Sequence, residues 1–367
     1  MELIELLKDA LAKDGSDVFI IPGSPVMVKA NGRMVALTQE RLMPADAEAL
    51  VRTAYSLASR NTNVLDEEGD DDFSFSVRDV SRFRCNTYKQ RGTVAATCRV
   101  VAFGLPNPKD VNIPDVVLNL AELRSGMVLV TGPAGNGKST TLACLVDRIN
   151  STRSGHIITI EDPIEFLHPH RMSLVSQREV PNDASTFARA LRAALRQAPD
   201  VIMLGEMRDQ ETISTAITAA ETGHLLMSSL HTLGAAKTID RIVDAFPAEQ
   251  QNQIRAQLSM VLKGVVSQRL ILTRDGGLTP VFEVMTVNPA IQNLIREGKT
   301  HQIDNAIFSG GPGMLSMDTE LMRLVKDGQI TQETAILHAV HPETMERGSR
   351  MAPPSPMGGG LGLGKRF

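Results

Sequence analysis

The sequence lacks long apolar runs, and no stretch approaches the ~20 residues that a transmembrane helix needs. Its first seven residues form an acidic amphipathic start without the basic segment that opens a secretory signal. The apolar and charged fractions, 42% and 22%, are those of a soluble globular protein. We therefore expect a cytoplasmic protein, and 367 residues are enough for two domains with separate cores.

Aromatic residues and net positive charge are also scarce. Phe, Tyr and Trp make up 4% of the chain, and the formal net charge is -4. A translocase of nucleic acid needs a basic channel and aromatic side chains on which bases stack. The composition therefore argues against nucleic acid as a partner.

Cysteine is nearly absent as well. Cys85, Cys98 and Cys144 form no C-x-x-C pair, and an odd number of cysteines suits a reducing cytoplasm. We expect all three to be small buried side chains. The sequence does not indicate zinc, because neither His224 nor His231 has an i, i+4 partner or a cysteine pair.

Against these absences, residues 132–139 carry a strong signal. They fit the pattern G-x-x-x-x-G-K-[ST] of a loop that binds nucleotide phosphates. The apolar run 127–130 before them predicts a buried strand, and 140–146 predict a helix whose amino end faces the phosphates. Lys138 supplies positive charge for the β- and γ-phosphates, and the Ser139 hydroxyl suits Mg²⁺.

A glycine-rich turn before an ordinary helix is the simpler interpretation of this loop, but the order of strand, loop and helix favours a phosphate site. The sequence therefore predicts that the chain binds ATP or GTP. The residues expected to hold the nucleotide are Gly132, Pro133, Ala134, Gly135, Asn136, Gly137, Lys138, Ser139 and Thr140.

The pattern along the chain predicts an α/β protein with two domains. Residues 1–102 mix helical and strand signals and predict a small α+β domain built on an antiparallel sheet. The proline-containing segment 103–115 is the expected linker. Residues 116–345 alternate strands and helices in the manner of a mainly parallel sheet, and the Pro- and Gly-rich residues 346–367 are expected to be disordered.

An acidic run at 66–72 invites interpretation as a cation site. It lacks the spacing of a calcium-binding loop, so we expect a solvated loop there.

Two further apolar strands are followed by acids. The strand predicted at 156–160 leads into Glu161 and Asp162, and the strand at 201–204 leads into Glu206. The carboxyl ends of parallel strands meet at one edge of a sheet, where ligands bind. Carboxylates at that edge can hold Mg²⁺ through water or polarise the water that attacks a γ-phosphate.

Two histidines follow these acids in the sequence. His224 closes a predicted helix, and His231 closes a third apolar strand. A cation at a helix end is favoured by the helix dipole, so His224 can be a capping residue. We favour a nucleotide-sensing or site-supporting role for both, with the stronger case for His231.

These segments together resemble the secretion-ATPase superfamily and, within it, the retraction ATPases of type IV pili. The similarity runs from residue 15 to about residue 340. It comprises a Walker A motif at 132–139, an Asp box at 159–165, a Walker B motif at 204–209, a His box at 220–232 and two further segments at 239–247 and 290–297. The last segment has a simpler interpretation as the apolar face of an ordinary helix.

The resemblance implies a RecA-like C-terminal ATPase domain, a smaller PAS-like N-terminal domain and a hexameric ring in which a neighbouring subunit completes the ATP site. It implies Glu165 as the general base for the attacking water. Glu161 and Asp162 would shape the environment of the metal and the water, and Glu206 would support Mg²⁺. The implied metal-binding residues are thus Ser139, Glu206 and Asp162.

The resemblance also implies that arginines of the N-terminal domain, Arg82 and Arg84, reach the phosphates, with Arg91 as a third. Taken from the residues alone, these arginines are ordinary surface charges of a strand. The sequence departs from the family pattern at Ala134, where Thr is usual, and at Asn136, where Ser is common. Neither position supplies the lysine or the metal-binding hydroxyl, so we expect activity to persist.

The implied function is an ATP-hydrolysing motor for pilus retraction and twitching motility at the inner face of the cytoplasmic membrane. Its implied partners are further copies in a homohexamer, the inner-membrane platform protein at the pilus base and a second retraction ATPase. The alternatives are an accessory retraction ATPase and an extension or type II secretion ATPase. Extension ATPases usually carry a longer N-terminal region and a four-cysteine zinc site, which this sequence does not show. A protein that binds nucleotide to gate assembly without hydrolysing it is an alternative of another class.

Overall fold

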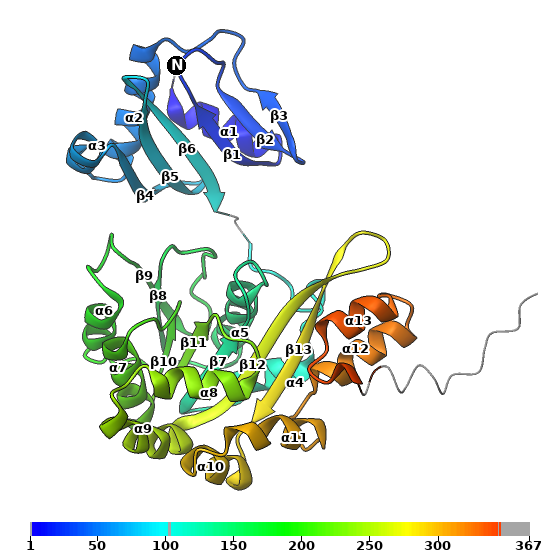
Figure 1. The fold of residues 1–367 in the computed structure, drawn as a ribbon. Helices are drawn as coiled ribbons and strands as arrows, with labels where there is room; N and C mark the ends of the chain where they lie inside the picture. The colour runs from blue at the N-terminus through cyan, green and yellow to red at the C-terminus, as the bar shows by residue number, and fades with distance from the viewer. Residues whose placement is uncertain (1, 102–103, 344, 346–367) are drawn as a thin grey trace, which may run out of the picture.

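The N-terminal part of the computed structural model is built on one antiparallel sheet with the strand order β3-β2-β1-β6-β5-β4 (Figure 1). The structure describes residues 2–101, 104–343 and 345, so the tail predicted at 346–367 lies outside the described residues. The elements of this domain are α1 (Leu3–Ala12), β1 (Gly15–Ile20), β2 (Met27–Ala30), β3 (Arg33–Ala36), α2 (Pro44–Leu57), α3 (Asn63–Glu68), β4 (Asp70–Val77), β5 (Ser81–Gln90) and β6 (Thr93–Val101).

Buried side chains alternate with exposed or half-buried ones along β4 and β5, so one face of this sheet is apolar. Phe73, Phe75 and Phe83 pack there with residues of α1 and α2 in one core. Cys85 and Cys98 are register partners in this core, and all three cysteines are free and buried, as predicted. The opposite face of β5 carries Arg82 and Arg84.

The acidic run at 66–72 is solvated as expected at five of its six acids, but it is not a loop and it buries one acid, Asp71. Its first part lies in α3 and its last part begins β4. The strand turns Asp71 inward, where it is 4% exposed. Asp71 accepts one hydrogen bond of 3.1 Å from the hydroxyl of Tyr55 and two from Arg60, at 2.8 and 3.0 Å. Burial raises the pKa of Tyr55 to about 12, and the charge of Asp71 acts in the same direction. The prediction was wrong about the loop and about Asp71, because a run of like charges does not reveal which acid the pleat of a strand will bury.

The larger domain is built on a seven-stranded sheet with the order β13-β12-β7-β11-β10-β8-β9. All neighbouring pairs are parallel except β12 and β13. The strands are β7 (Gly126–Thr131), β8 (His156–Glu161), β9 (Leu174–Glu179), β10 (Val201–Leu204), β11 (Leu225–Leu230), β12 (Leu262–Leu272) and β13 (Leu278–Thr286). The strands predicted at 127–130, 156–160 and 201–204 are confirmed as parts of β7, β8 and β10.

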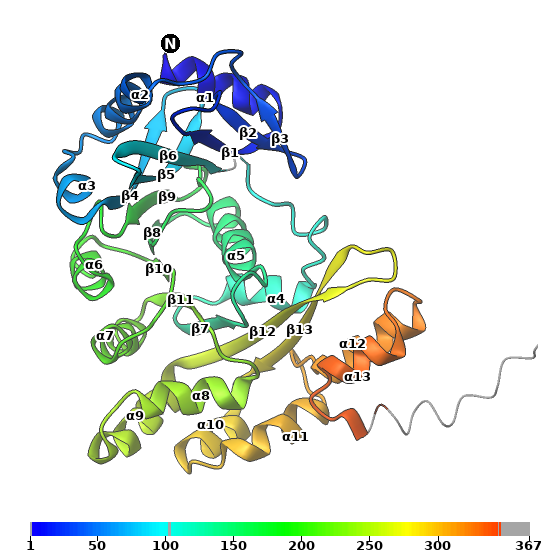
Figure 2. The same cartoon turned by 45° about the horizontal axis from the view of Figure 1, so that its top comes forward.

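Helices cover both faces of this sheet (Figures 1 and 2). The first face packs on α4 (Asp115–Leu118), η1 (Asn119–Glu122) and α5 (Lys138–Thr152). The second face packs on α6 (Phe187–Ala194), α7 (Gln210–Glu221), α8 (Ala235–Asp244), α9 (Ala248–Val261), α10 (Pro289–Arg296) and α11 (Ile303–Phe308). The remaining elements are η2 (Thr300–Gln302), α12 (Met317–Lys326) and α13 (Gln332–His338).

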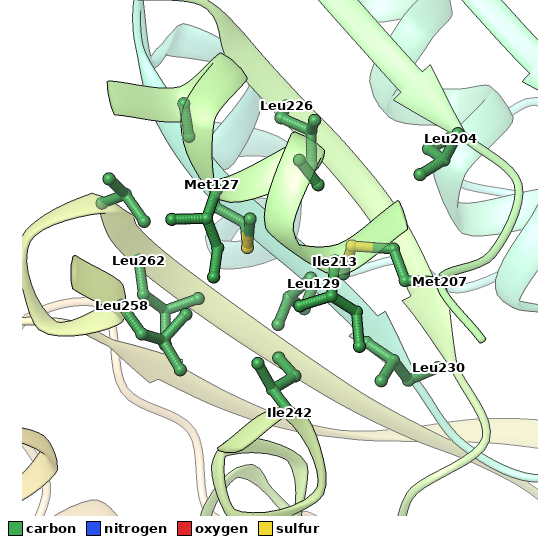
Figure 3. Packing of buried hydrophobic residues seen from close by; sticks show 14 of the residues in the cluster. Met127, Leu129, Leu204, Met207, Ile213, Leu226, Leu230, Ile242, Leu258 and Leu262 are labelled. Carbon is green, nitrogen blue, oxygen red and sulfur yellow. The ribbon is translucent and has the colours of Figure 1, made fainter. Parts of the chain in front are cut away.

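Figure 3 shows the packing on the second face, where Met127 and Leu129 of β7 lie among Ile213, Ile242 and Leu258 from three helices. Each such side chain contributes about 1.5–3 kcal/mol when it is fully buried. Ile291 and Ile295 of α10 join this core, so the segment at 290–297 presents an apolar helix face to it. No helix among the described residues combines the length and the apolar character that a membrane span requires.

Candidate functional site

A pocket of about 250 Å³ lies at the edge of the large sheet where β7, β8, β10 and β11 end. Its walls come from the phosphate loop, from the segments that follow β8 and β10, and from the end of β11. The polar and charged residues lining it are Lys138, Ser139, Glu161, Asp162, Glu165, His168, Glu206, Arg208, Ser229 and His231. The structure thus brings together the four segments that the sequence analysis singled out.

The phosphate loop wraps around the amino end of α5. Lys138 is 8% exposed, and its Nζ donates hydrogen bonds of 2.9 Å to the carbonyl oxygens of Gly132 and Pro133. Burial lowers the pKa of Lys138, and the charges of Glu206 and Glu165 oppose this shift. A phosphate would therefore provide the counter-charge that the buried ammonium group lacks at close range.

Residues of β12 form hydrogen bonds with the phosphate loop and the first turn of α5, and the sequence analysis did not predict these contacts. Oε1 of Gln268 accepts a hydrogen bond of 2.7 Å from Oγ1 of Thr141, and the backbone N–H of Leu270 donates one of 2.7 Å to Oδ1 of Asn136. Gly132 has φ of 145°, and a Cβ there would lie 2.2 Å from the carbonyl oxygen of Gln268. Glycine is thus required at this position by both conformation and space.

Glu161 is the last residue of β8 and is 8% exposed. It accepts hydrogen bonds from Oγ1 of Thr159 at 2.6 Å, from Nε2 of Gln177 at 3.2 Å and from the backbone N–H of Glu165. Burial raises the pKa of Glu161 to about 7, although these hydrogen bonds act in the opposite direction. Asp162 and Glu165 follow in an exposed loop, which leaves them free to meet a ligand in the pocket.

Glu206 is positioned by two neighbouring cationic or polar groups. Its side chain is 12% exposed and lies 2.6 Å from Nη2 of Arg208 and 3.3 Å from Nε2 of His231. Nδ1 of His231 lies 3.4 Å from Nζ of Lys138, so the imidazole bridges the phosphate loop and the acid after β10. His231 therefore lies within reach of both groups, and a role for it in sensing the γ-phosphate stays a prediction.

The donors around the pocket fit Mg²⁺, which prefers oxygen ligands. The hydroxyl of Ser139 and the carboxylates of Glu206 and Asp162 line the same pocket. Within the described residues, no three or more His, Cys, Asp and Glu side chains are arranged to hold a metal by themselves. Phosphate oxygens and water would therefore complete the coordination.

The structure does not bring the three arginines of the N-terminal domain to this pocket. Arg82 forms an ion pair of 2.9 Å with Glu179 at the end of β9, and Nε of Arg84 lies 3.7 Å from Asp72. Arg91 lies in the turn between β5 and β6, at the far end of β5 from Arg82. Arg82 and Arg84 thus pair with carboxylates outside the pocket, although the charge of Arg84 also reaches Asp162 at the pocket, where it opposes the rise in the pKa of Asp162 that burial causes.

His224 also lies away from the pocket. It precedes β11, whereas His231 follows it, so the two histidines are at opposite edges of the sheet. Nδ1 of His224 lies 2.9 Å from the carbonyl oxygen of Ala219 and 3.1 Å from the hydroxyl of Thr222, at the carboxyl end of α7. Its contacts are those of a helix-capping residue.

Sequence reasoning missed Gln177, Glu179 and Gln268. The first two lie on β9. The sequence did not predict this strand, because its buried and exposed positions alternate irregularly. Gln268 is separated from Thr141 by 127 residues. Local sequence carries no signal for such pairs.

A second pocket of about 640 Å³ adjoins the first along α5. Residues 104–108 of the linker, Asp147 and Arg171 contribute to its walls, and His168 lines both pockets. Burial lowers the pKa of His168 to about 4, with the charge of Arg171 acting in the same direction, and Nδ1 has no hydrogen-bond partner. The neutral imidazole of His168 therefore forms part of the wall of both pockets.

Comparison with known proteins decides the family. The family described as "Type II/IV secretion system protein" matches residues 109–276. The protein of Pseudomonas aeruginosa named "Type IV pilus retractation ATPase PilT" is 43% identical over 344 residues, which cover 94% of this chain and 99% of that protein. The chain belongs to the PilT family of type II/IV secretion ATPases.

Other members of the PilT family support this assignment. The "Twitching motility protein" of Neisseria gonorrhoeae is 41% identical, with 94% of this chain and 92% of that protein covered. The "Type IV pilus ATPase PilU" of Pseudomonas aeruginosa is 38% identical over 92% of this chain and 89% of its own. The resemblance stated from the motifs is thus confirmed.

A crystal structure of the retraction motor PilT with bound ADP matches the fold with a TM-score of 0.87 at 45% identity, covering 95% of this chain and 99% of that one. The ATPase DotB of Legionella pneumophila matches with a TM-score of 0.80 at 27% identity, covering 92% and 95%. The predicted α/β fold with its smaller N-terminal domain is therefore that of the PilT family.

Proposed function

We propose that this chain hydrolyses ATP and uses the energy to retract a type IV pilus. The observation that carries the proposal is the meeting of Lys138, Glu165, Glu206 and His231 in one pocket. Because the chain matches PilT of Pseudomonas aeruginosa over nearly the whole length of both proteins, this site belongs to the same kind of motor.

Binding begins with an exchange of partners at Lys138. The β- and γ-phosphates would take the ammonium group from the carbonyl oxygens of Gly132 and Pro133, while the N–H groups at the amino end of α5 receive the phosphate charge. Ser139, with Glu206 and Asp162, would hold Mg²⁺, which neutralises phosphate charge when it is bound. The similarity to a PilT crystal structure that holds ADP supports nucleotide binding by this chain.

Glu165 is the proposed general base. It is exposed in the pocket, so its carboxylate can accept a proton from a water directed at the γ-phosphate. Glu161 is buried and engaged by three donors, one of which is the backbone N–H of Glu165. Glu161 therefore positions the base, and His231 connects Lys138 with Glu206 on the other side of the pocket.

The proposal includes a homohexamer located at the inner face of the cytoplasmic membrane, with the inner-membrane platform protein of the pilus as a direct partner and a second retraction ATPase as a further one. An accessory role like that of PilU is the nearest alternative, and the lower identity to PilU favours the primary motor. The presence of both Glu165 and Glu206 at the pocket argues against a protein that binds nucleotide without hydrolysing it.

Phosphate release by the purified full-length protein tests the enzymatic part. The wild type should turn over ATP, and Glu165→Gln should bind nucleotide but lose nearly all turnover. Glu249→Gln, an exposed carboxylate on α9, is the matched control and should retain activity. Nucleotide binding by the wild type without phosphate release would refute a motor. Cells lacking the protein should keep their pili and lose twitching, whereas loss of the pili themselves would indicate extension.

A further inference from the structure

Glu179 stands at a junction between the two domains. It is the last residue of β9, paired in register with Glu161, and it is 1% exposed. Its Oε1 accepts a hydrogen bond of 2.6 Å from Nδ2 of Asn182. Its Oε2 is shared by two donors, the backbone N–H of Ile164 at 3.0 Å and Nη2 of Arg82 at 2.9 Å.

These two donors come from parts of the molecule with different roles. Arg82 belongs to β5 of the N-terminal domain, and its side chain is 17% exposed. Ile164 belongs to the loop after β8 and directly precedes Glu165, the proposed base. One carboxylate oxygen therefore joins the docked N-terminal domain to the loop that presents the base.

A buried carboxylate depends strongly on its partners. Removing the cation from a buried ion pair leaves an uncompensated charge, which is strongly destabilising unless the surroundings rearrange. If Arg82 leaves, Glu179 must move toward water or take a proton, and either change disturbs the bond to Ile164. The rest of the loop stays anchored, because the N–H of Glu165 faces Glu161 and Gln177 donates to the carbonyl oxygen of Phe166 and accepts the N–H of His168. The segment around Ile164, next to the base, is the part that loses its contact with β9.

A second contact between the domains converges on the same carboxylate. Nη1 of Arg60 donates to Oδ1 of Asn182 at 3.3 Å, and Asn182 in turn donates to Glu179. The buried Asp71 holds the guanidinium of Arg60 with two hydrogen bonds. The unexpected burial of this acid thus places an arginine at the domain junction.

We infer that Glu179 is a positioning residue that makes the placement of Glu165 depend on the docking of the N-terminal domain, and that Arg82 acts through Glu179 and not on the phosphates. The inference rests on the proposed function, because it assigns the coupling to the base of that reaction. It differs from the expectation drawn from the family resemblance, in which Arg82 reaches the phosphates.

A double-mutant cycle on the full-length protein tests the inference. Arg82→Gln and Glu179→Gln should each lower kcat about tenfold with KM changed less than about twofold, and the double variant should be no slower than Glu179→Gln alone. Arg82→Lys, which keeps the charge, should recover much of the loss. Arg99→Gln is the matched control, because its 2.8 Å ion pair with Asp17 lies within the N-terminal domain.

The opposite results would overturn the inference. Multiplicative losses in the double variant, or weaker ADP binding in Arg82→Gln, would mean that Arg82 acts on the nucleotide. If Glu179→Gln fails to fold, Arg60→Gln and Asn182→Ala replace it, with smaller kcat losses expected in the same direction.

Amide hydrogen exchange separates this inference from the proposed function. Residues 162–168 should exchange faster in Arg82→Gln than in the wild type and Arg99→Gln, whether or not the protein hydrolyses ATP. Unchanged exchange there would refute the coupling, while absent turnover by the wild type would refute only the proposed reaction.

Discussion

Oε1 of Gln268 accepts a hydrogen bond of 2.7 Å from Oγ1 of Thr141, and this bond joins β12 to the first turn of α5. Both residues are buried, at 3% and 0% exposure, so neither group has water as a substitute partner. The amino end of α5, which faces the phosphates, is therefore fixed against a strand far away in the sequence.

Replacing Gln268 should weaken nucleotide binding more than it weakens the fold. Gln268→Leu leaves the Thr141 hydroxyl unsatisfied, which costs about 1–3 kcal/mol and loosens the turn beneath the phosphates. We expect nucleotide affinity to fall about tenfold in a titration with fluorescent ADP. Gln257→Ala, which removes an exposed bond to Glu221 on the surface, is the control and should bind normally.

Two glycines of the phosphate loop should differ in their tolerance of alanine. At Gly132 a Cβ would meet the carbonyl oxygen of Gln268 at 2.2 Å, whereas at Gly135 nothing lies within 4 Å. Both have positive φ, so Gly135→Ala carries a conformational cost of about 1–2 kcal/mol and no collision. Gly132→Ala should abolish nucleotide binding and Gly135→Ala should only weaken it. Equal binding by the two variants would contradict this account.

Glu283 on β13 should make stability depend on pH. It is 5% exposed and accepts the N–H of Ala235 at 3.1 Å. Burial raises its pKa to about 7, with Asp304 and Asp318 acting in the same direction and Arg269 opposing. Between the unfolded pKa near 4.5 and about 7, the folded state keeps a proton that the unfolded state has lost, so the free energy of unfolding falls as pH rises.

Glu283→Gln should therefore flatten this slope. At pH 8 its free energy of unfolding should exceed that of the wild type by on the order of 1–3 kcal/mol, so that it unfolds at a higher urea concentration. Glu161 contributes with the same sign, because burial also raises its pKa to about 7, so some slope should remain. Urea titrations at several pH values measure the effect. Glu249→Gln should reproduce the wild-type profile, and an unchanged slope in Glu283→Gln would show that Glu283 is ionised in the fold.

Asp209 should link helix stability to the position of Glu206. Asp209 lies three residues after Glu206, and its Oδ1 caps α7 by accepting a hydrogen bond of 2.8 Å from the N–H of Thr212. Asp209→Ala should cost about 1 kcal/mol in thermal unfolding and should also lower kcat, while Asp209→Asn restores both. Thr331→Ala removes the comparable cap of α13 and should lower stability without lowering kcat.

Much of this site could be predicted because its signals are local. The phosphate loop and the acids after β8 and β10 each lie within a few residues of the strand that positions them. Since parallel strands end at a common edge, the order of the segments was enough to bring Lys138, Glu165 and Glu206 together.

The contacts that hold the site in place could not be predicted in this way. Glu179 contacts Arg82 from another domain, and Gln268 contacts Thr141, which lies 127 residues earlier in the sequence. Such pairs depend on how strands are ordered in the sheet, which the spacing of apolar residues does not encode. The burial of Asp71 within the acidic run at 66–72 was missed for a related reason, because only the register of β4 decides that this acid points inward.

The uniform burial of β7, β10 and β11 has a consequence for how force is produced. Every residue of these three strands is buried, so their amide groups should exchange only when the whole domain unfolds. We expect a sheet of this kind to move as one block. We therefore expect movement that accompanies nucleotide turnover to occur between the two domains, at the proline-containing residues 104–114, and not within the sheet.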